Sequence, residues 1–177
     1  REINFDYTIV TEELIFNYFS DLKHLIKKII IEDDSKILLN GNIEGKINNW
    51  RTPIKGWKNY WYGKFKLVEY VYNNYECDNY LVINTRFDIL SNYNTKNINI
   101  EMIINFLKSN MKNLKKNVFL NENYPHHGID NFYLGNIYTM YLLSHYFHNS
   151  LDFILKRNSD ILITERIVFL ESNIIFK

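Results

Sequence analysis

The order of apolar patterns along the chain constrains its fold more than any other feature. Short runs of β-branched and aromatic residues, typical of strands, occur at positions 5–10, 28–32 and 79–84. Between them, the apolar residues of 14–29 and 57–75 recur every three or four positions, as they do on one face of a helix. Strand, helix, strand, helix, strand is the order of an α/β fold. The pattern therefore predicts a mainly parallel sheet flanked by helices, in a single domain that spans the 177 residues.

The second half of the chain predicts two further helices and a short strand. Asn99 is a good N-cap for a helix over 100–114, and the apolar residues of 137–154 predict a longer helix. Residues 117–120 predict a short strand, whereas the period of the C-terminal 161–176 fits a helix or a strand. Two polar stretches that contain glycine predict loops: residues 33–51, with room for one short strand, and residues 121–131.

Composition excludes several classes of protein. The chain carries 21 Lys and Arg against 20 Asp and Glu, a net charge of +1, which argues against a protein that binds nucleic acid by neutralising phosphates. The single cysteine, Cys77, cannot form an internal disulfide, and no run of about 18 apolar residues predicts a membrane span. We therefore expect a cytoplasmic protein. The chain has no Ala and no Gln and is rich in residues with AT-rich codons, so residue propensities carry less information than usual.

Arg86 and Asp88 follow directly on the predicted strand 79–84 and are the first candidate site residues. In an open α/β sheet, ligands bind beyond the carboxyl ends of the strands. Residues two apart in an extended chain point the same way, so this guanidinium and this carboxylate could share one ligand. The guanidinium suits a phosphate, and the carboxylate suits a divalent cation on a diphosphate. A local Arg–Asp ion pair at the strand end is the alternative.

A twelve-residue segment that ends at Asn136 gathers two His, an Asp and two Gly, and is the second candidate site. Asp130 is a candidate general base that deprotonates an acceptor hydroxyl. His126 and His127 are candidates for a metal or a phosphate contact. The alternative is a turn in which the glycines serve the backbone and the histidines are solvated. Asn131 or Asn136 would then cap the following helix.

Three other patterns have a plainer interpretation. His145 and His148, three positions apart, are expected on a helix surface rather than at a metal. Trp57 and Trp61, one helical turn apart, are expected to pack in the core. The basic run of four lysines within 108–116 is expected to be a solvated helix face, because it lacks the interleaved aromatic residues of a single-strand nucleic-acid groove.

Taken in order, these segments resemble a family of glycosyltransferases with a GT-A-like, Rossmann-like fold, found in giant viruses, protists and some bacteria. The family's strand of the type Tyr-Asp-x-Val-Ile-x-x-Arg-x-Asp is similar to residues 79–88, and its later Asp-Asn-Phe-aromatic-x-Gly motif is similar to residues 130–135. An aromatic-rich segment ahead of the strand matches residues 61–65, and Glu165 resembles an acid that the family carries on a helix.

One family feature is missing. The family's first strand usually ends in Ser-Gly-Gln-x-Arg, which helps to bind the nucleotide, and this chain has no such segment. The chain also begins at Arg1 rather than at Met. We therefore expect either a chain truncated before that strand or an incomplete nucleotide site.

The resemblance implies transfer of a sugar from a nucleotide-sugar donor to a hydroxyl of a glycan or protein acceptor, in the host cytoplasm or a virus factory if the protein is viral. It implies three sets of site residues: Arg86, Asp88, Asn131 and Gly135 for the donor, Asp88 and His127 for Mn²⁺ or Mg²⁺, and Asp130 and Glu165 for catalysis.

Two rival functions stay open. One is a catalytically degenerate transferase that serves as a binding or structural module, for instance in a viral particle. The other is a metal-dependent hydrolase or nuclease that uses Asp88, His126 and Asp130, although the chain shows no second carboxylate pair for a two-metal site. The transferase hypothesis predicts that Asp88 and Asp130 meet beside Arg86 in one cleft.

Overall fold

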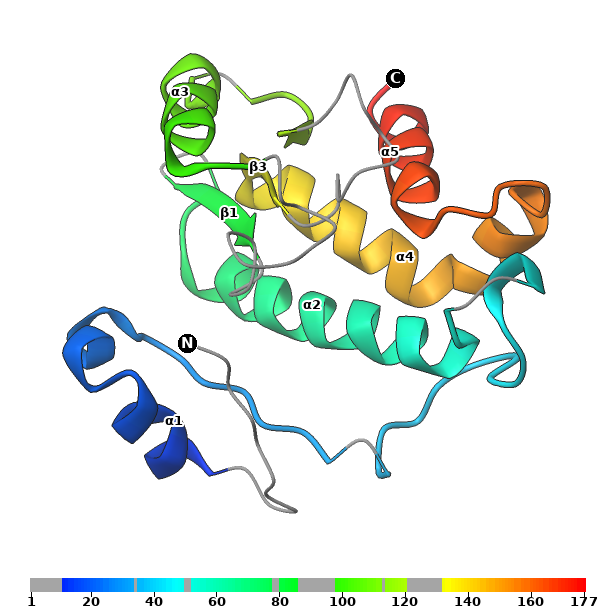
Figure 1. The fold of residues 1–177 in the computed structure, drawn as a ribbon, viewed down its shortest axis with the longest axis horizontal. Helices are drawn as coiled ribbons and strands as arrows, with labels where there is room; N and C mark the ends of the chain where they lie inside the picture. Colours follow the sequence, from blue (N-terminus) through cyan, green and yellow to red (C-terminus); the bar gives the residue numbers. More distant parts are fainter. Residues whose placement is uncertain are drawn as a thin grey trace. The chain divides into compact units, whose positions relative to one another are not determined.

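The computed structural model (Figure 1) describes seven stretches of the chain: residues 11–33, 35–49, 52–77, 80–85, 98–112, 114–120 and 132–177. The chain divides into two compact units, Arg1–Leu38 and Leu39–Lys177. The predicted strand at 5–10 and the predicted loop at 121–131 lie outside the described residues. The expectation of a single domain stays a prediction.

The first unit contains a short helix followed by a tighter turn. α1 (Glu12–Tyr18) begins after Thr11, whose hydroxyl accepts a hydrogen bond from the backbone N–H of Leu14 at 3.2 Å. Two acids in the first turn suit the positive end of the helix dipole. A 3₁₀ segment, η1 (Ser20–Leu25), continues the chain. Helical structure therefore ends at Leu25, earlier than the apolar pattern of 14–29 predicts.

The predicted strand at 28–32 is wrong. Residues 26–33 form neither strand nor helix, and 42% of the surface of Ile31 is exposed. A β-branched run forms a buried strand only where neighbouring strands complete its backbone hydrogen bonds. The described residues of this unit contain no such strand.

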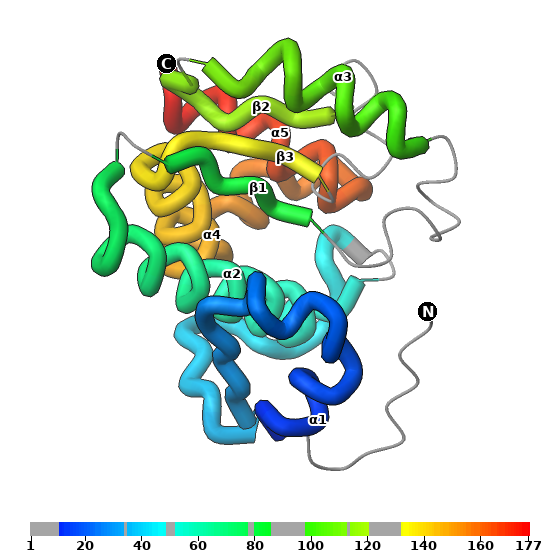
Figure 2. The backbone as a smooth tube through the Cα atoms, turned by 90° about the vertical axis from the view of Figure 1, so that its left-hand side faces the viewer, coloured from blue at the N-terminus to red at the C-terminus, as the bar shows by residue number. Residues whose placement is uncertain are grey.

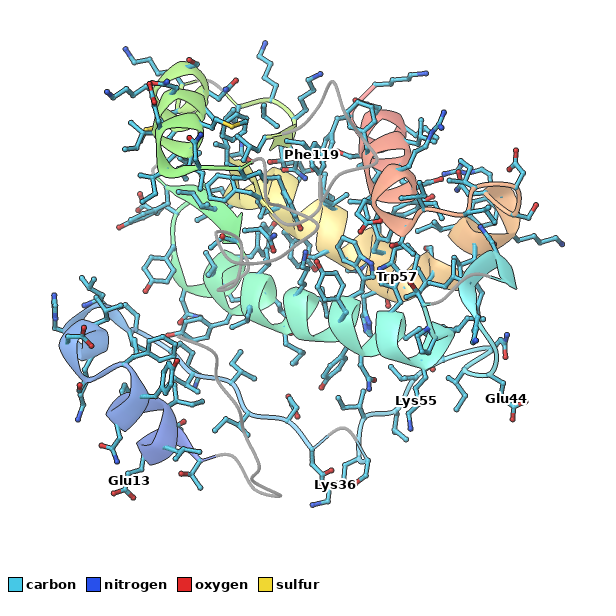
Figure 3. The ribbon with its side chains drawn as sticks, in the orientation of Figure 1. Glu13, Lys36, Glu44, Lys55, Trp57 and Phe119 are labelled. Atoms are coloured by element: carbon cyan, nitrogen blue, oxygen red, sulfur yellow. The ribbon has the colours of Figure 1, made fainter. Side chains whose placement is uncertain are left out.

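Two long helices form the centre of the second unit. α2 (Ile54–Asn74) and α4 (Ile137–Arg157) lie side by side (Figure 1). The rings of Trp61 and Phe147 stack between them with centroids 4.1 Å apart, and Trp57 lies edge-on to Phe147 at 5.9 Å. Figure 3 shows Trp57 between the two helices. Both predicted helices are confirmed, as is the core position of both tryptophans.

The sheet of the second unit has three short strands. They are β1 (Leu81–Thr85), β2 (Val118–Phe119) and β3 (Phe132–Asn136), in the order β1-β3-β2. Both pairings are antiparallel. The register of β1 with β3 runs from Leu81 opposite Asn136 to Thr85 opposite Phe132, and β3 is the central strand.

Helices pack on both faces of this sheet. Phe132 and Tyr133 are consecutive in β3, so their side chains point to opposite faces. On the face of Phe132 lies α3 (Ile100–Asn110), whose Phe106 ring is 6.0 Å from that of Phe132. Tyr133 belongs to the core that α2 and α4 form. Figure 2 accordingly shows α3 on the side of the sheet away from α2.

The smaller elements settle several open points. α5 (Thr164–Ile175) makes the C-terminal residues helical and packs through the buried Ile167 and Val168. Asn99 caps α3, as predicted, by accepting a hydrogen bond from the N–H of Met102 at 2.9 Å. The loop before α2 contains a 3₁₀ turn, η2 (Ile47–Asn49).

Across the described ranges, every helix falls short of the length or the apolar character that a membrane span requires.

The predicted fold class is wrong. The described residues are mostly helical, and their sheet is small and antiparallel rather than the parallel sheet of a Rossmann-like or GT-A-like domain. Parallel strands need a crossover helix between them, whereas here α2 precedes β1 and α4 follows β3. The long helices therefore flank the β1–β3 pair in sequence and do not connect parallel strands.

The segment before α2 is hydrogen-bonded to side chains of both long helices. Lys58 of α2, whose side chain is 7% exposed, pairs with Asp152 of α4 at 2.8 Å and donates to the carbonyl of Asn40. Asp152 also accepts a hydrogen bond from the N–H of Asn42 at 3.1 Å. Gly41 has φ +73°, and a Cβ there would lie 1.7 Å from the carboxylate of Asp152. A side chain at this position therefore meets both backbone strain and a clash.

Candidate functional site

The candidate site lies at the end of the sheet where β1 finishes and β3 starts. Thr85, the last residue of β1, is the register partner of Phe132, the first residue of β3. Paired residues of antiparallel strands have Cα atoms about 4.5–5.5 Å apart. The chain therefore leaves β1 and enters β3 at the same end of the sheet.

The two candidate segments of the sequence attach at this end. Arg86 of the first segment directly follows β1, and Asn131 of the second segment directly precedes β3. Six predicted site residues belong to these segments and lie outside the described residues: Arg86, Asp88, His126, His127, Asp130 and Asn131. Their roles stay predictions.

Gly135 lies in β3 opposite Val82, three residues along the strand from Phe132. It is buried, and a Cβ there would lie 2.2 Å from Oδ1 of Asn117 and 2.5 Å from Oγ1 of Thr139. Asn117 is 4% exposed and donates through Nδ2 to the carbonyl of Thr139 at 3.2 Å. The packing thus gives Gly135 a steric role: it leaves room for the side chain of Asn117. Its predicted contact with a donor stays a prediction.

Glu165 occupies the first turn of α5, where a negative charge suits the helix dipole. Its side chain is half-buried and accepts a hydrogen bond from the hydroxyl of Thr164 at 3.1 Å. Its catalytic role stays a prediction.

A lysine with aromatic neighbours lies on the α2 side of the sheet, beside Tyr133 of β3. Lys64 of α2 places Nζ 4.2 Å from the ring centroid of Tyr60 and 5.0 Å from those of Trp61 and Tyr133. It also donates a hydrogen bond to the hydroxyl of Tyr133 at 3.3 Å. Tyr133 pairs with Asn84, the residue before the end of β1. Cation–π contacts thus hold a positive charge on this side of the sheet.

A buried carboxylate joins α4 to α5. Glu171 of α5 is fully buried and pairs with the guanidinium of Arg157, whose Nε donates at 3.1 Å. The hydroxyl of Tyr146 and the amide of Asn158 donate to the same carboxylate at 3.1 and 2.6 Å. Partial burial and the charge of Glu171 raise the pKa of Tyr146, and the hydrogen bond to Glu171 raises the pKa of Arg157.

Sequence reasoning missed this network, although a signal for it exists. Glu171 follows Ile167 by four positions and Val168 by three, so it lies on the apolar face of α5. An acid on a buried stripe predicts a buried partner, because an unpaired charge there is costly. All four side chains of the network satisfy one another, and this arrangement favours a structural role over a ligand site.

The two helix histidines belong to an aromatic seam between α2 and α4. His148 stacks on Phe65 with centroids 4.9 Å apart, and Tyr62 lies edge-on to it at 5.5 Å. His145 contacts Phe65 at 5.6 Å. Burial and then the neighbouring His145 lower the pKa of His148. The ring of His148 therefore packs among aromatic side chains, where burial disfavours its charged form.

The described ranges hold no group of three or more His, Cys, Asp or Glu side chains arranged for a metal ion. The proposed ligands Asp88 and His127 belong to the segments outside those ranges. No family model, curated protein or solved structure matches the chain. The glycosyltransferase resemblance therefore rests on the sequence motifs alone.

Proposed function

We propose that this chain is a glycosyltransferase domain that moves a sugar from a nucleotide-sugar donor to a hydroxyl of a glycan or protein acceptor in the cytoplasm. The observation that carries the proposal is the pairing of Thr85 with Phe132. It supports the proposal because Arg86 follows Thr85 and Asn131 precedes Phe132 in the sequence, and the two strand residues lie opposite each other. This support does not depend on a parallel sheet.

The residue types at this end suit a diphosphate. The guanidinium of Arg86 offers two parallel N–H donors to phosphate oxygens, and Asn131 adds an amide. The ammonium group of Lys64 adds a positive charge on the α2 side of the sheet. Positive groups fixed beside a diphosphate stabilise the charge that develops on it as it leaves.

In the proposed step, the acceptor oxygen forms a bond to the anomeric carbon of the sugar. The bond from that carbon to the diphosphate oxygen breaks, and its electron pair leaves with the nucleoside diphosphate. Asp130 takes the proton of the acceptor hydroxyl. Glu165 is the second candidate for this base. We propose Asp88 and His127 as ligands of Mn²⁺ or Mg²⁺, a cation that would offset phosphate charge when bound.

One observation favours a second function. The small antiparallel sheet and the mostly helical second unit differ from the fold that the resemblance implies. A non-catalytic binding or structural module is therefore the second candidate. Such a module would keep the fold without turning over a donor.

A donor screen tests the proposal. Thermal unfolding of the chain is followed with UDP-, GDP- and dTDP-sugars, each with and without Mn²⁺, for the wild type, Asp88→Asn and Asp130→Asn. A ligand at about 100 times its Kd stabilises by about 2.7 kcal/mol, or roughly 5–10 °C in Tm for a chain of this size. Asp160→Asn, an exposed change of the same charge, is the matched control.

We expect one donor to raise Tm in the wild type and the control, and a smaller rise in Asp88→Asn. Asp130→Asn should keep the rise, because its carboxylate serves the acceptor. If no donor shifts Tm in any protein, or if Asp160→Asn loses the shift as well, the transferase proposal fails and the binding module is favoured.

A further inference from the structure

Helix α3 uses only one side to pack on the sheet. Ile103, Phe106 and Leu107 face the cluster around Phe132 and Ile98. The helix lies at the periphery of the second unit in both views (Figures 1 and 2). All the other residues of α3 except Asn110 are exposed.

A stripe of aliphatic side chains runs along the outer surface of α3. Ile100, Ile104 and Met111 are 60%, 43% and 56% exposed. Their spacing of four and seven residues places them on one face of the helix. None of them belongs to either apolar core. Three large apolar side chains in one exposed row are a feature that often marks an interaction site.

A block of positive charge borders this stripe. Lys108 lies in the last turn of α3, four positions after Ile104, and Lys112 lies two residues beyond the end of the helix. Lys115 and Lys116 follow in the chain, and all four lysines are exposed. Residues 98–120 contain one acid, Glu101, against these four lysines, in a chain whose net charge is only +1.

We propose that this face of α3 binds the surface of an anionic phospholipid membrane. Lysines beside a row of aliphatic side chains are the pattern of helices that lie in the lipid interface, with the charges at the headgroups and the apolar row below them. The concentrated positive charge complements anionic lipid and would repel a basic protein partner. The exposed row of α3 lacks the aromatic side chains on which bases of single-stranded nucleic acid stack. The proposed membrane contact does not depend on the proposed transferase activity.

Vesicle co-sedimentation tests the proposal. The whole chain is mixed with vesicles of phosphatidylcholine alone or of phosphatidylcholine and phosphatidylserine in equal parts, and bound protein is measured. Each lysine near an anionic surface contributes about fivefold in partitioning, so Lys108→Gln/Lys112→Gln should bind about 25-fold more weakly. Lys55→Gln/Lys156→Gln removes the same charge from exposed positions of α2 and α4 and is the matched control.

We expect binding only to vesicles with phosphatidylserine, loss of most binding in Lys108→Gln/Lys112→Gln, and wild-type binding in the control. Ile104→Asn should also weaken binding, and an unchanged circular dichroism spectrum and Tm would show that each variant is folded. Equal binding to both vesicle types, no binding to either, or equal loss in the control variant overturns the proposal. Binding of a single-stranded oligonucleotide through the same lysines, without vesicle binding, also overturns it and favours a nucleic-acid partner.

Discussion

The ion pair of Glu171 and Arg157 predicts an asymmetric response to mutation. The side chain of Glu171 is 0% exposed, whereas that of Arg157 is 35% exposed. Replacing Arg157 by Met leaves a buried carboxylate with only Tyr146 and Asn158 as donors. Removing one partner of a buried pair costs about 3–5 kcal/mol, because the remaining charge is uncompensated.

The opposite change is milder. Glu171→Leu leaves a guanidinium that already reaches water, and it removes an acceptor from Tyr146 and Asn158. The expected cost is about 1–3 kcal/mol. In the double variant Arg157→Met/Glu171→Leu no charge stays buried, so part of the loss from Arg157→Met should be recovered, by about 2 kcal/mol.

Urea unfolding of the four proteins, followed by circular dichroism, gives these free energies by linear extrapolation. Additive losses in the double variant, or equal losses in both single variants, would refute this account of the α4–α5 contact.

Three smaller predictions concern packing and pH. Gly135→Ala should destabilise by about 1–3 kcal/mol in chemical unfolding, because its Cβ meets Asn117; full stability would show that Asn117 moves freely. Gly41→Ala should cost about 1–3 kcal/mol, since φ is positive and Asp152 is close; a loss below that range would show that this loop rearranges. Since burial lowers the pKa of His148, folding excludes a proton there, and stability should decline as the pH falls from about 7 to 5. His148→Phe should reduce this decline, measured as Tm against pH. An unchanged dependence of Tm on pH would show that His148 is not its source.

The long helices could be predicted from the sequence because their apolar stripes extend over several turns. α2 and α4 carry such stripes, and Asn99 marks the start of α3 by its capping side chain. Periodicity that persists this long outweighs a biased composition. α2 and α4 also meet in the core, where Trp61 stacks on Phe147.

Strands are harder to predict from the sequence than these helices, because a short apolar run does not show which strand it pairs with. Residues 28–32 have the composition of a strand but form none, while β3 lay unrecognised in a segment that contains Gly135. The choice of an antiparallel rather than a parallel sheet depends on contacts between β1 and β3, which are about 50 residues apart in sequence. Such long-range pairing leaves no local signal.

The sequence shows which residue types the candidate site offers, but it does not show how they are arranged. Arg86 and Asp88 after a predicted strand, and Asp130 in a predicted loop, are visible in the sequence. The pairing of β1 with β3, which puts Thr85 opposite Phe132, is visible only in the tertiary structure. Glu171 was missed because a single acid within an apolar stripe resembles an exposed helix position until the stripe is seen to be buried.

Release of nucleoside diphosphate tests the central claim most directly. The stabilising donor from the thermal screen is incubated with the wild type and Asp130→Asn and with a mixture of hydroxyl acceptors, and the released diphosphate is measured. A general base contributes about 10²–10⁴-fold to the rate, so Asp130→Asn should lose that factor while the donor still raises its Tm. Equal release by both proteins, or release by neither although the donor binds, would contradict the proposed transferase.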